Sequence, residues 1–261
     1  SPNPCPQPTM IARTPFTLIG NEPPYTFNNN GWVADGENRT IGNAAEAGID
    51  SDGTQGVDNN GWAFSDAGRN FVFAYDPAPG LTPPGQSPLP TGTQPYPPTP
   101  FQQGSATNAF YLANRWHDET YLLGFNESSR NFQTDNFGRG GISNDSLSVE
   151  IQDGTGSNSA NFSTPADGIR PRAQCFVWTS STPARDGALD AQIVLHEFTH
   201  GLSNRRIGNA TGLTGNMARG MGEGWSDFYG HALLSEPGDP INGIYTTGSY
   251  DTYLGGGTTT N

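Results

Sequence analysis

Two of the four histidines in this chain lie four residues apart in the apolar stretch 191-AQIVLHEFTHGLSNRR-206, and a glutamate follows the first of them. A helix advances about 100° per residue, so His196 and His200 would share one face and could both bind one metal ion. Glu197 would lie beside that ion and could take a proton from its water. Because two imidazoles and a carboxylate are costly to bury without partners, we interpret the segment as a zinc site rather than as core.

A catalytic zinc ion needs a third protein ligand and one position open for water. The segment 220-GMGEGWSDFYGHALL-234 offers Glu223 as that ligand, and Asp227 can accept a hydrogen bond from the non-ligating nitrogen of one of the two histidines. Glu223 lies among apolar residues that we expect to be buried: Met221, Trp225 and Phe228. The glycines around it would let the two helices approach closely: Gly220, Gly222 and Gly224.

Three other features carry weaker signals. We interpret His117, on an apolar stripe, as a hydrogen-bonded core residue rather than a catalytic one. His231 could join the hydrogen bonds around the metal, but a place on a helix surface or in the core is favoured. The segment 50-DSDGTQGVD-58 is weakly similar to a calcium loop, but it lacks the third oxygen position and the closing glutamate. Calcium is therefore possible but unsupported.

Hydrophobic periodicity and turn residues predict the elements that position these side chains. The predicted helices cover 105–125, 186–204 (capped by Asp186 or Asp190) and 219–235. The predicted strands cover 69–76, 147–153 and 174–180, with a ragged edge strand within 156–164. Prolines indicate an extended crossover over 77–100. We therefore divide the chain into a β-rich N-terminal region (1–100), a catalytic core (101–236), and a flexible tail or truncated lobe (237–261).

Composition excludes several classes of function. The net charge is −13 and all 12 basic residues are arginines without clustering, so a nucleic-acid partner is not expected. No apolar run approaches the about 20 residues of a membrane span. Five N-x-S/T sequons and only two cysteines favour a secreted glycoprotein. Glycans are expected on Asn38, Asn126, Asn144 and Asn209. Cys5 and Cys175 either form one disulfide or remain thiols.

The chain resembles the fungalysin family of secreted fungal zinc metalloproteases from about residue 105 to 235. HEFTHGLSNR and GMGEGWSDF carry the resemblance, together with five upstream stretches. These are NAFYLANRWHD at 108–118, LLGF at 122–125, NFQTDNFGRGG at 131–141, QDGTGSNSANFSTPADG at 152–168 and WTSSTPARDG at 178–187.

The resemblance implies an α+β, thermolysin-like fold, in which a β-rich half ends in the zinc helix and faces a helical C-terminal lobe across the active cleft. It implies that His196, His200 and Glu223 bind one zinc ion, that Glu197 is the catalytic carboxylate, and that Asp227 is the acid that orients a histidine. The implied activity is zinc-dependent endopeptidase action on proteins or peptides, and the implied product is a secreted enzyme made with an inhibitory N-terminal propeptide.

The family's catalytic unit continues past the position of Asn261. We therefore expect the C-terminal helical lobe to be absent from this chain or supplied as a separate chain. The alternative is a non-catalytic, zinc-holding glycoprotein fragment or interaction module that lacks the second lobe.

The substrate is expected to bind as an added β-strand along an exposed sheet edge. Ala160 and Asn161 are the candidates for that edge, by their position before the zinc helix and by the family match; an ordinary loop is the alternative. A glycan on Asn161 would crowd the cleft, so we expect none there.

Overall fold

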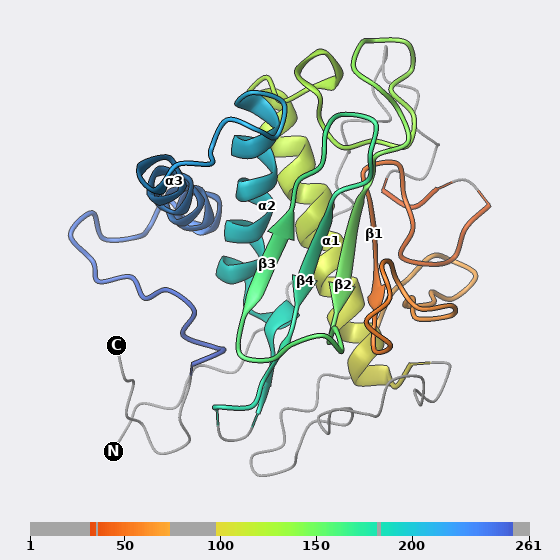
Figure 1. Cartoon of the computed structure of the whole chain (residues 1–261). Coiled ribbons are helices and arrows are strands. Elements are labelled where there is room, and N and C mark those ends of the chain that lie inside the picture. Colours follow the sequence, from red (N-terminus) through yellow and green to blue (C-terminus); the bar gives the residue numbers. More distant parts are fainter. Residues whose placement is uncertain (1–31, 35, 74–97, 182–183, 253–261) are drawn as a thin grey trace, which may run out of the picture.

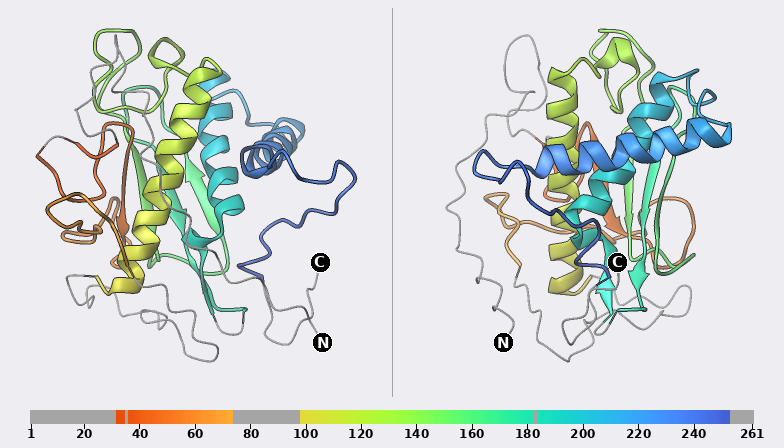
Figure 2. Two further views of the ribbon diagram at one scale, coloured as in Figure 1. Left: turned by 180° about the vertical axis from the view of Figure 1, so that it is seen from behind. Right: turned by 90° about the vertical axis from the view of Figure 1, so that its left-hand side faces the viewer.

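The structure is a computed structural model that describes residues 32–34, 36–73, 98–181 and 184–252. A four-stranded sheet has two long helices on one face, and a third helix lies across the second of them (Figure 1; Figure 2). In spatial order the strands are β1 (Ala45–Ile49), β2 (Leu147–Ile151), β4 (Arg172–Cys175) and β3 (Ala160–Ser163). A separate pair is formed by β5 (Val177–Trp178) and β6 (Arg185–Asp186). The α-helices are α1 (Pro100–Leu122), α2 (Ala191–Arg206) and α3 (Asn216–Leu234), with 3-10 turns η1 (Glu127–Ser129) and η2 (Gly187–Leu189).

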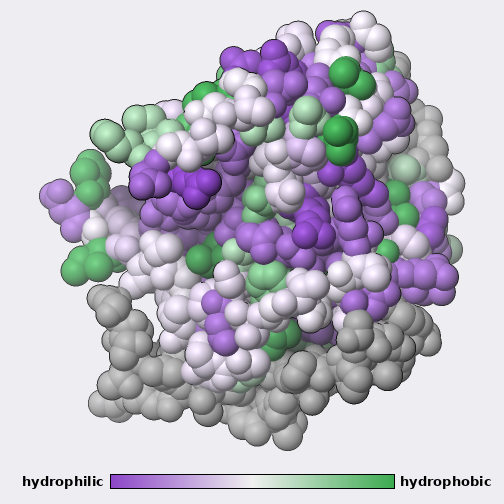
Figure 3. All heavy atoms as spheres, viewed as in Figure 1, coloured by the Kyte–Doolittle hydropathy of each residue, from purple (hydrophilic) through white to green (hydrophobic). Residues whose placement is uncertain are grey.

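The two faces of the sheet differ in polarity. Strands β1, β2 and β4 are parallel, and β3 pairs antiparallel with β4 at the edge. Side chains alternate between the faces of a strand. The face under the helices is apolar, as in the cross-strand row Ala47, Val149 and Ala173. The next row, with Glu150 and Gln174, points the other way, and Figure 3 shows hydrophilic side chains gathered on that side.

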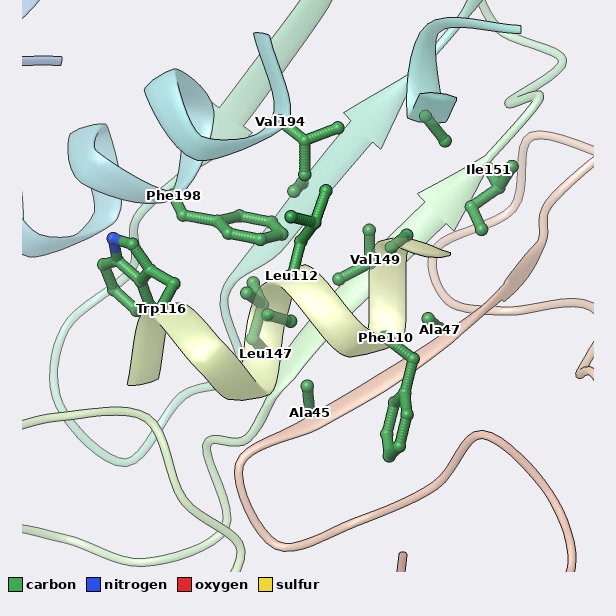
Figure 4. Packing of buried hydrophobic residues seen from close by; sticks show 14 of the residues in the cluster. Ala45, Ala47, Phe110, Leu112, Trp116, Leu147, Val149, Ile151, Val194 and Phe198 are labelled. Atoms are coloured by element: carbon green, nitrogen blue, oxygen red, sulfur yellow. The ribbon is translucent and has the colours of Figure 1, made fainter. Parts of the chain in front are cut away.

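The core fixes α1 and α2 to the sheet. The ring of Trp116 in α1 lies 5.8 Å from that of Phe198 in α2 and stacks on Phe132 at 6.0 Å. Figure 4 shows Trp116 and Phe198 near Leu112 of α1 and Leu147 of β2. Because Phe198 lies between the two histidines of α2, this packing also fixes the direction in which they point.

Local capping sets the helix starts. The amide of Gln102 donates to Oγ1 of Thr99 at 3.3 Å, and Thr99 N donates back to Oε1 of Gln102 at 3.0 Å. This capping box, with proline in the first turn, starts α1 at Pro100 rather than at the predicted residue 105. The predicted crossover 77–100 therefore ends in the first residue of a helix.

Both predicted caps of the zinc helix are used, but for different helices. Asp186 accepts from Ala188 N at 3.0 Å and caps the turn η2. Asp190 accepts from the amides of Gln192 and Ile193 and caps α2. The long helix therefore starts later than the predicted residue 186, while α3 starts earlier than the predicted residue 219.

The predicted strand over 69–76 is wrong in its described part, because residues 69–73 form no strand. Val72 there is 81% exposed, so it lacks the burial that would stabilise a strand. Within the described part of the N-terminal region, the strand of the main sheet is β1, which pairs with β2.

The predicted strand over 174–180 is divided in two. Phe176 N donates to Ser159 O, and Phe176 O accepts from Gly187 N, so the chain leaves the main sheet there and continues as β5. The strand predicted over 147–153 corresponds to β2, and β3 lies within the predicted edge-strand segment 156–164.

Some expectations concern residues that the structure does not describe. These are Cys5, most of the proline-rich crossover and the end of the tail. Cys175 is buried in β4, and the two alternatives for its pairing stay open. Within the described ranges, no helix has both the length and the apolar character needed to cross a bilayer.

Candidate metal centre

Three donor atoms from α2 and α3 converge on one point. Nε2 of His196 lies 3.1 Å from Nε2 of His200 and 3.2 Å from Oε2 of Glu223. The third separation, from His200 Nε2 to Glu223 Oε2, is 3.3 Å. Donors at three corners of a tetrahedron around zinc lie about 3.3 Å apart when each bond is about 2.0–2.1 Å. The spacing and chemistry of these groups therefore fit three zinc ligands with one corner left over.

Asp227 contacts one of these imidazoles. Its Oδ1 lies 2.8 Å from Nδ1 of His196. An ionised carboxylate only accepts hydrogen bonds, so the contact favours a proton on Nδ1 and a free lone pair on Nε2. Because Asp227 follows Glu223 by one helical turn, α3 brings the third donor and the orienting acid to the same place.

Glu197 has a drier environment than the three donors. It is 8% exposed, and this burial, reinforced by the negative charge of Glu223, raises the pKa of Glu197 to about 8. Burial also lowers the pKa of His200; Glu223 opposes that shift and His196 adds to it. A divalent cation between the donors would favour an ionised Glu197 and neutral imidazoles. The arrangement can thus bind a metal and move a proton beside it.

Helix α3 approaches α2 through a stripe of small side chains. The buried residues of α3 recur at every fourth position: Gly222, Ser226 and Gly230. A Cβ at Gly230 would come 3.2 Å from the carbonyl oxygen of Gln192, so a larger residue would push the helices apart. Of the three glycines expected to serve this contact, Gly220 and Gly224 instead face open space.

The apolar residues around Glu223 are not buried as expected. Met221 is 53% exposed, Phe228 65% and Trp225 37%. Their types suggested a core position, but within the described residues α3 buries only its narrow stripe of small residues.

Strand β3 forms the edge of the sheet next to α2. A Cβ on Gly201, the residue after His200, would come 2.5 Å from the ring of Phe162, so β3 and α2 are in close contact. Ala160 is half-buried and Asn161 is exposed on this edge strand. The expected edge strand is therefore present, and the substrate-binding role of Ala160 and Asn161 stays a prediction.

The other two histidines lie where the weaker signals placed them. His117 is buried, with Nδ1 3.0 Å from Asp118 Oδ1 and Nε2 3.0 Å from Gln133 Oε1. His231 is half-buried near the end of α3 and lies 2.6 Å from the side-chain nitrogen of Gln192.

The sequon asparagines are accessible to different degrees. Asn38 and Asn144 are exposed, as is Asn161, whereas Asn126 and Asn209 are half-buried. Their glycosylation stays a prediction.

A second group of acidic residues was not predicted from the sequence. Asp50, Glu150 and Asp153 are all buried, and their carboxylate oxygens lie within 4.8 Å of one another. The sequence points to Asp50 only as part of the loop 50–58. The group could have been predicted from the acids at the ends of β1 and β2 only if the parallel pairing of these two strands had been known.

Comparison with known proteins extends the match almost to the N-terminus. The family model described as fungalysin metallopeptidase (M36) matches residues 7–257, well beyond the 105–235 range of the motifs. "Probable extracellular metalloproteinase 5" of Arthroderma benhamiae is 38% identical over 257 residues, which cover 95% of this chain and 37% of that protein. "Extracellular metalloproteinase 3" of Trichophyton soudanense is 40% identical over 246 residues, 93% of this chain and 57% of that protein. This chain thus spans 37% of the length of the first of these relatives, and it belongs to the fungalysin metallopeptidase family.

Proposed function

We propose that this protein is a secreted, zinc-dependent endopeptidase. The observation that carries the proposal is the convergence of His196, His200 and Glu223 beside a buried Glu197. The names of the relatives, extracellular metalloproteinases, support both secretion and action on proteins or peptides.

In the proposed mechanism, each residue has one task. When bound, zinc supplies Lewis acidity toward the substrate carbonyl and lowers the pKa of a coordinated water. Glu197 takes a proton from the attacking water and gives it to the leaving amine as the peptide bond breaks. Asp227 keeps His196 in the tautomer that binds metal through Nε2. The buried position of Glu197 strengthens its electrostatic interactions with the reacting groups.

The substrate would bind along the edge of β3. A peptide in extended form can pair with an exposed edge strand through backbone hydrogen bonds. Because β3 packs against α2 beside His200, a peptide on that edge would pass close to the metal donors. Ala160 and Asn161 would then contact the peptide, and Asn161 would carry no glycan.

A further lobe would complete the cleft in the whole protein. Large apolar side chains on α3 are exposed to solvent: Met217 is 92% exposed and Phe228 is 65% exposed. Large apolar side chains that are exposed in this way are typical of an interaction site. We propose that a helical lobe, on the same chain or a separate one, covers this side of α3, and that an N-terminal propeptide blocks the cleft before activation.

The alternative is a zinc-holding glycoprotein without catalysis. Both proteins would bind zinc, but only the peptidase would cleave casein or a quenched peptide in a manner abolished by a zinc chelator. The position of Glu197 favours the peptidase, because a purely structural zinc site has no use for a buried carboxylate beside its ligands.

Substitution of the proposed base tests the mechanism. Glu197→Gln should retain one zinc ion per chain and reduce turnover by at least about 100-fold, since the amide cannot accept the proton. Glu236→Gln, which neutralises an exposed carboxylate, should keep full activity. Peptide hydrolysis and zinc content should be measured on the same samples. Undiminished hydrolysis by zinc-loaded Glu197→Gln would refute the proposal.

A further inference from the structure

A group of buried acids, here called the acid cluster, lies at the ends of two neighbouring parallel strands. Asp50 follows β1, Glu150 lies in β2, and Asp153 comes two residues after the end of β2. Their carboxylate oxygens lie within 4.8 Å of one another, and all three residues are buried. Asp50 also belongs to a second group of this kind, with Asp52 and Asp58.

Two oxygens of the acid cluster lack hydrogen bonds. Within the described residues, Oδ2 of Asp50 and Oε2 of Glu150 accept none, although Asp50 is 1% exposed and Glu150 is fully buried. Nη1 of Arg172 lies 3.8 Å from Glu150 Oε2, beyond hydrogen-bond distance. A buried carboxylate oxygen without a hydrogen bond is costly, and these two atoms therefore favour a bound cation.

The other oxygens of the same side chains are held in place. Gly53 N donates to Oδ1 of Asp50 and Gly56 N to Oε1 of Glu150, each at 3.0 Å. Asp153 Oδ1 accepts from the amide of Thr155 at 2.7 Å. Asp50 and Glu150 therefore each have one oxygen fixed by the backbone and one left over, as expected for preorganised cation ligands.

The pKa values of two of these acids also favour a cation site. Burial, together with the negative charges of Asp153, Glu150, Asp58 and Asp52, raises the pKa of Asp50 to about 8. Burial also raises the pKa of Glu150 to about 7, against the attraction of Arg172. The ionised cluster is thus unfavourable as it stands, and a divalent cation would relieve it.

We propose that Asp50, Glu150 and Asp153 bind a calcium ion. Carboxylate oxygens are hard ligands that suit calcium, and the set contains no histidine or cysteine that would favour zinc. Calcium accepts oxygens at about 2.3–2.6 Å, so oxygens bound to one ion lie at most about 5 Å apart. Magnesium requires shorter bonds in octahedral geometry and usually retains several waters, so it suits a buried carboxylate site less well.

The calcium ion would stabilise the approach to the substrate edge. Asp153 accepts a hydrogen bond from the side chain of Gln174 in β4, and Gln174 pairs in register with Asn161 of β3. The segment from Asp153 leads directly into β3 at Ala160. The acid cluster shares no residue with the zinc donors, so calcium binding is independent of the proposed peptidase activity.

Equilibrium dialysis with radioactive calcium tests the proposal. The full chain should carry Glu197→Gln to prevent self-digestion, with zinc supplied at one equivalent. We expect one calcium ion per chain, and a rise in unfolding temperature of about 5–10 °C at calcium concentrations far above the dissociation constant. No calcium binding, or binding without a change in unfolding temperature, would overturn the proposal.

Asp50→Asn separates a calcium site from a cluster that is merely protonated. At about pH 8, the variant should unfold at a higher temperature than its parent without calcium, because it relieves repulsion, and at a lower temperature with saturating calcium. Glu236→Gln removes the same charge from the surface and should respond to calcium like the parent. The assignment would be refuted if Asp50→Asn changed the unfolding temperature relative to its parent by the same amount with and without calcium. Calcium binding by the variant that is as tight as in the parent would refute it too.

Discussion

At the residue scale, the proton on Nδ1 of His196 decides whether this histidine can bind a metal. Asp227 holds that proton from 2.8 Å, and this leaves Nε2 free to act as a donor. Glu197 differs from His196 and Asp227, because burial raises the pKa of Glu197 when no cation is present. In the proposed mechanism, the neighbouring acids Glu197, Glu223 and Asp227 thus have three separate tasks, which depend on the exposure and the partner of each.

Removal of the orienting acid should weaken metal binding. Asp227→Ala deletes the acceptor for Nδ1 of His196, so we expect zinc affinity to fall about 10- to 100-fold in competition with a chromophoric chelator. Asp227→Asn retains a carbonyl oxygen and should lose less. Equal affinities in the parent and the alanine variant would show that the contact does not position the imidazole.

The residue types near the metal were readable from the sequence because their spacing is local. His196, Glu197 and His200 lie within one turn and a half of a helix, so no knowledge of the tertiary fold was required. The exposure of Met221, Trp225 and Phe228 was mispredicted, because burial depends on which elements pack against α3.

At the element scale, the centre depends on how closely α3 lies on α2. The stripe of Gly222, Ser226 and Gly230 allows the contact, and Glu223 then reaches the imidazoles of the other helix. The sequence predicted small residues here, and Gly222 is one of the buried three. Gly220 and Gly224 instead face open space, because the side of α3 that meets α2 depends on how the helices cross rather than on composition.

A bulky side chain in this stripe should separate the helices. Gly230→Val would place new atoms against the carbonyl of Gln192, and we expect it to cost about 1–3 kcal/mol of unfolding free energy and to weaken zinc binding. Gly224→Val makes the same change in the same helix at a position with nothing within 4 Å, so it controls for helix propensity. Denaturant unfolding and zinc titration measure both effects. Equal losses in the two variants would contradict the close contact.

Strands were harder to predict than helices. Strand β1 reads AEAGI, with few residues of high β-propensity, and it is stable because α1 and β2 bury it. The segment 69-RNFVFAYD-76 has the propensity of a strand, yet residues 69–73 form none. Whether each segment forms a strand depends on the presence of a partner strand, and partner strands come from distant parts of the chain.

At the scale of the whole molecule, buried carboxyl groups control how stability varies with pH. Burial raises the pKa of Asp251 to about 9, and the pKa of Asp50 is raised to about 8. A carboxyl group with a raised pKa in the folded state stabilises most below its unfolded pKa of about 4 and loses that contribution as pH rises through the folded value.

The unfolding temperature in calcium-free, zinc-saturated buffer should therefore fall between about pH 6 and pH 9. Saturating calcium should remove the part of this decline that comes from Asp50 and Glu150 and leave the part that comes from Asp251. Calorimetry across this range, with Asp251→Asn as the matched variant, measures the two parts. A stability that increases over the same range would contradict the raised pKa values.

The central claim concerns the ligands of one ion, and X-ray absorption at the zinc edge of the native protein tests it most directly. We predict one zinc ion per chain, with two imidazole nitrogens, one carboxylate oxygen and one further light ligand at about 2.0–2.2 Å. Glu223→Gln should change that spectrum and weaken binding. A sulfur ligand, a single imidazole, or a spectrum that Glu223→Gln leaves unchanged would contradict the account.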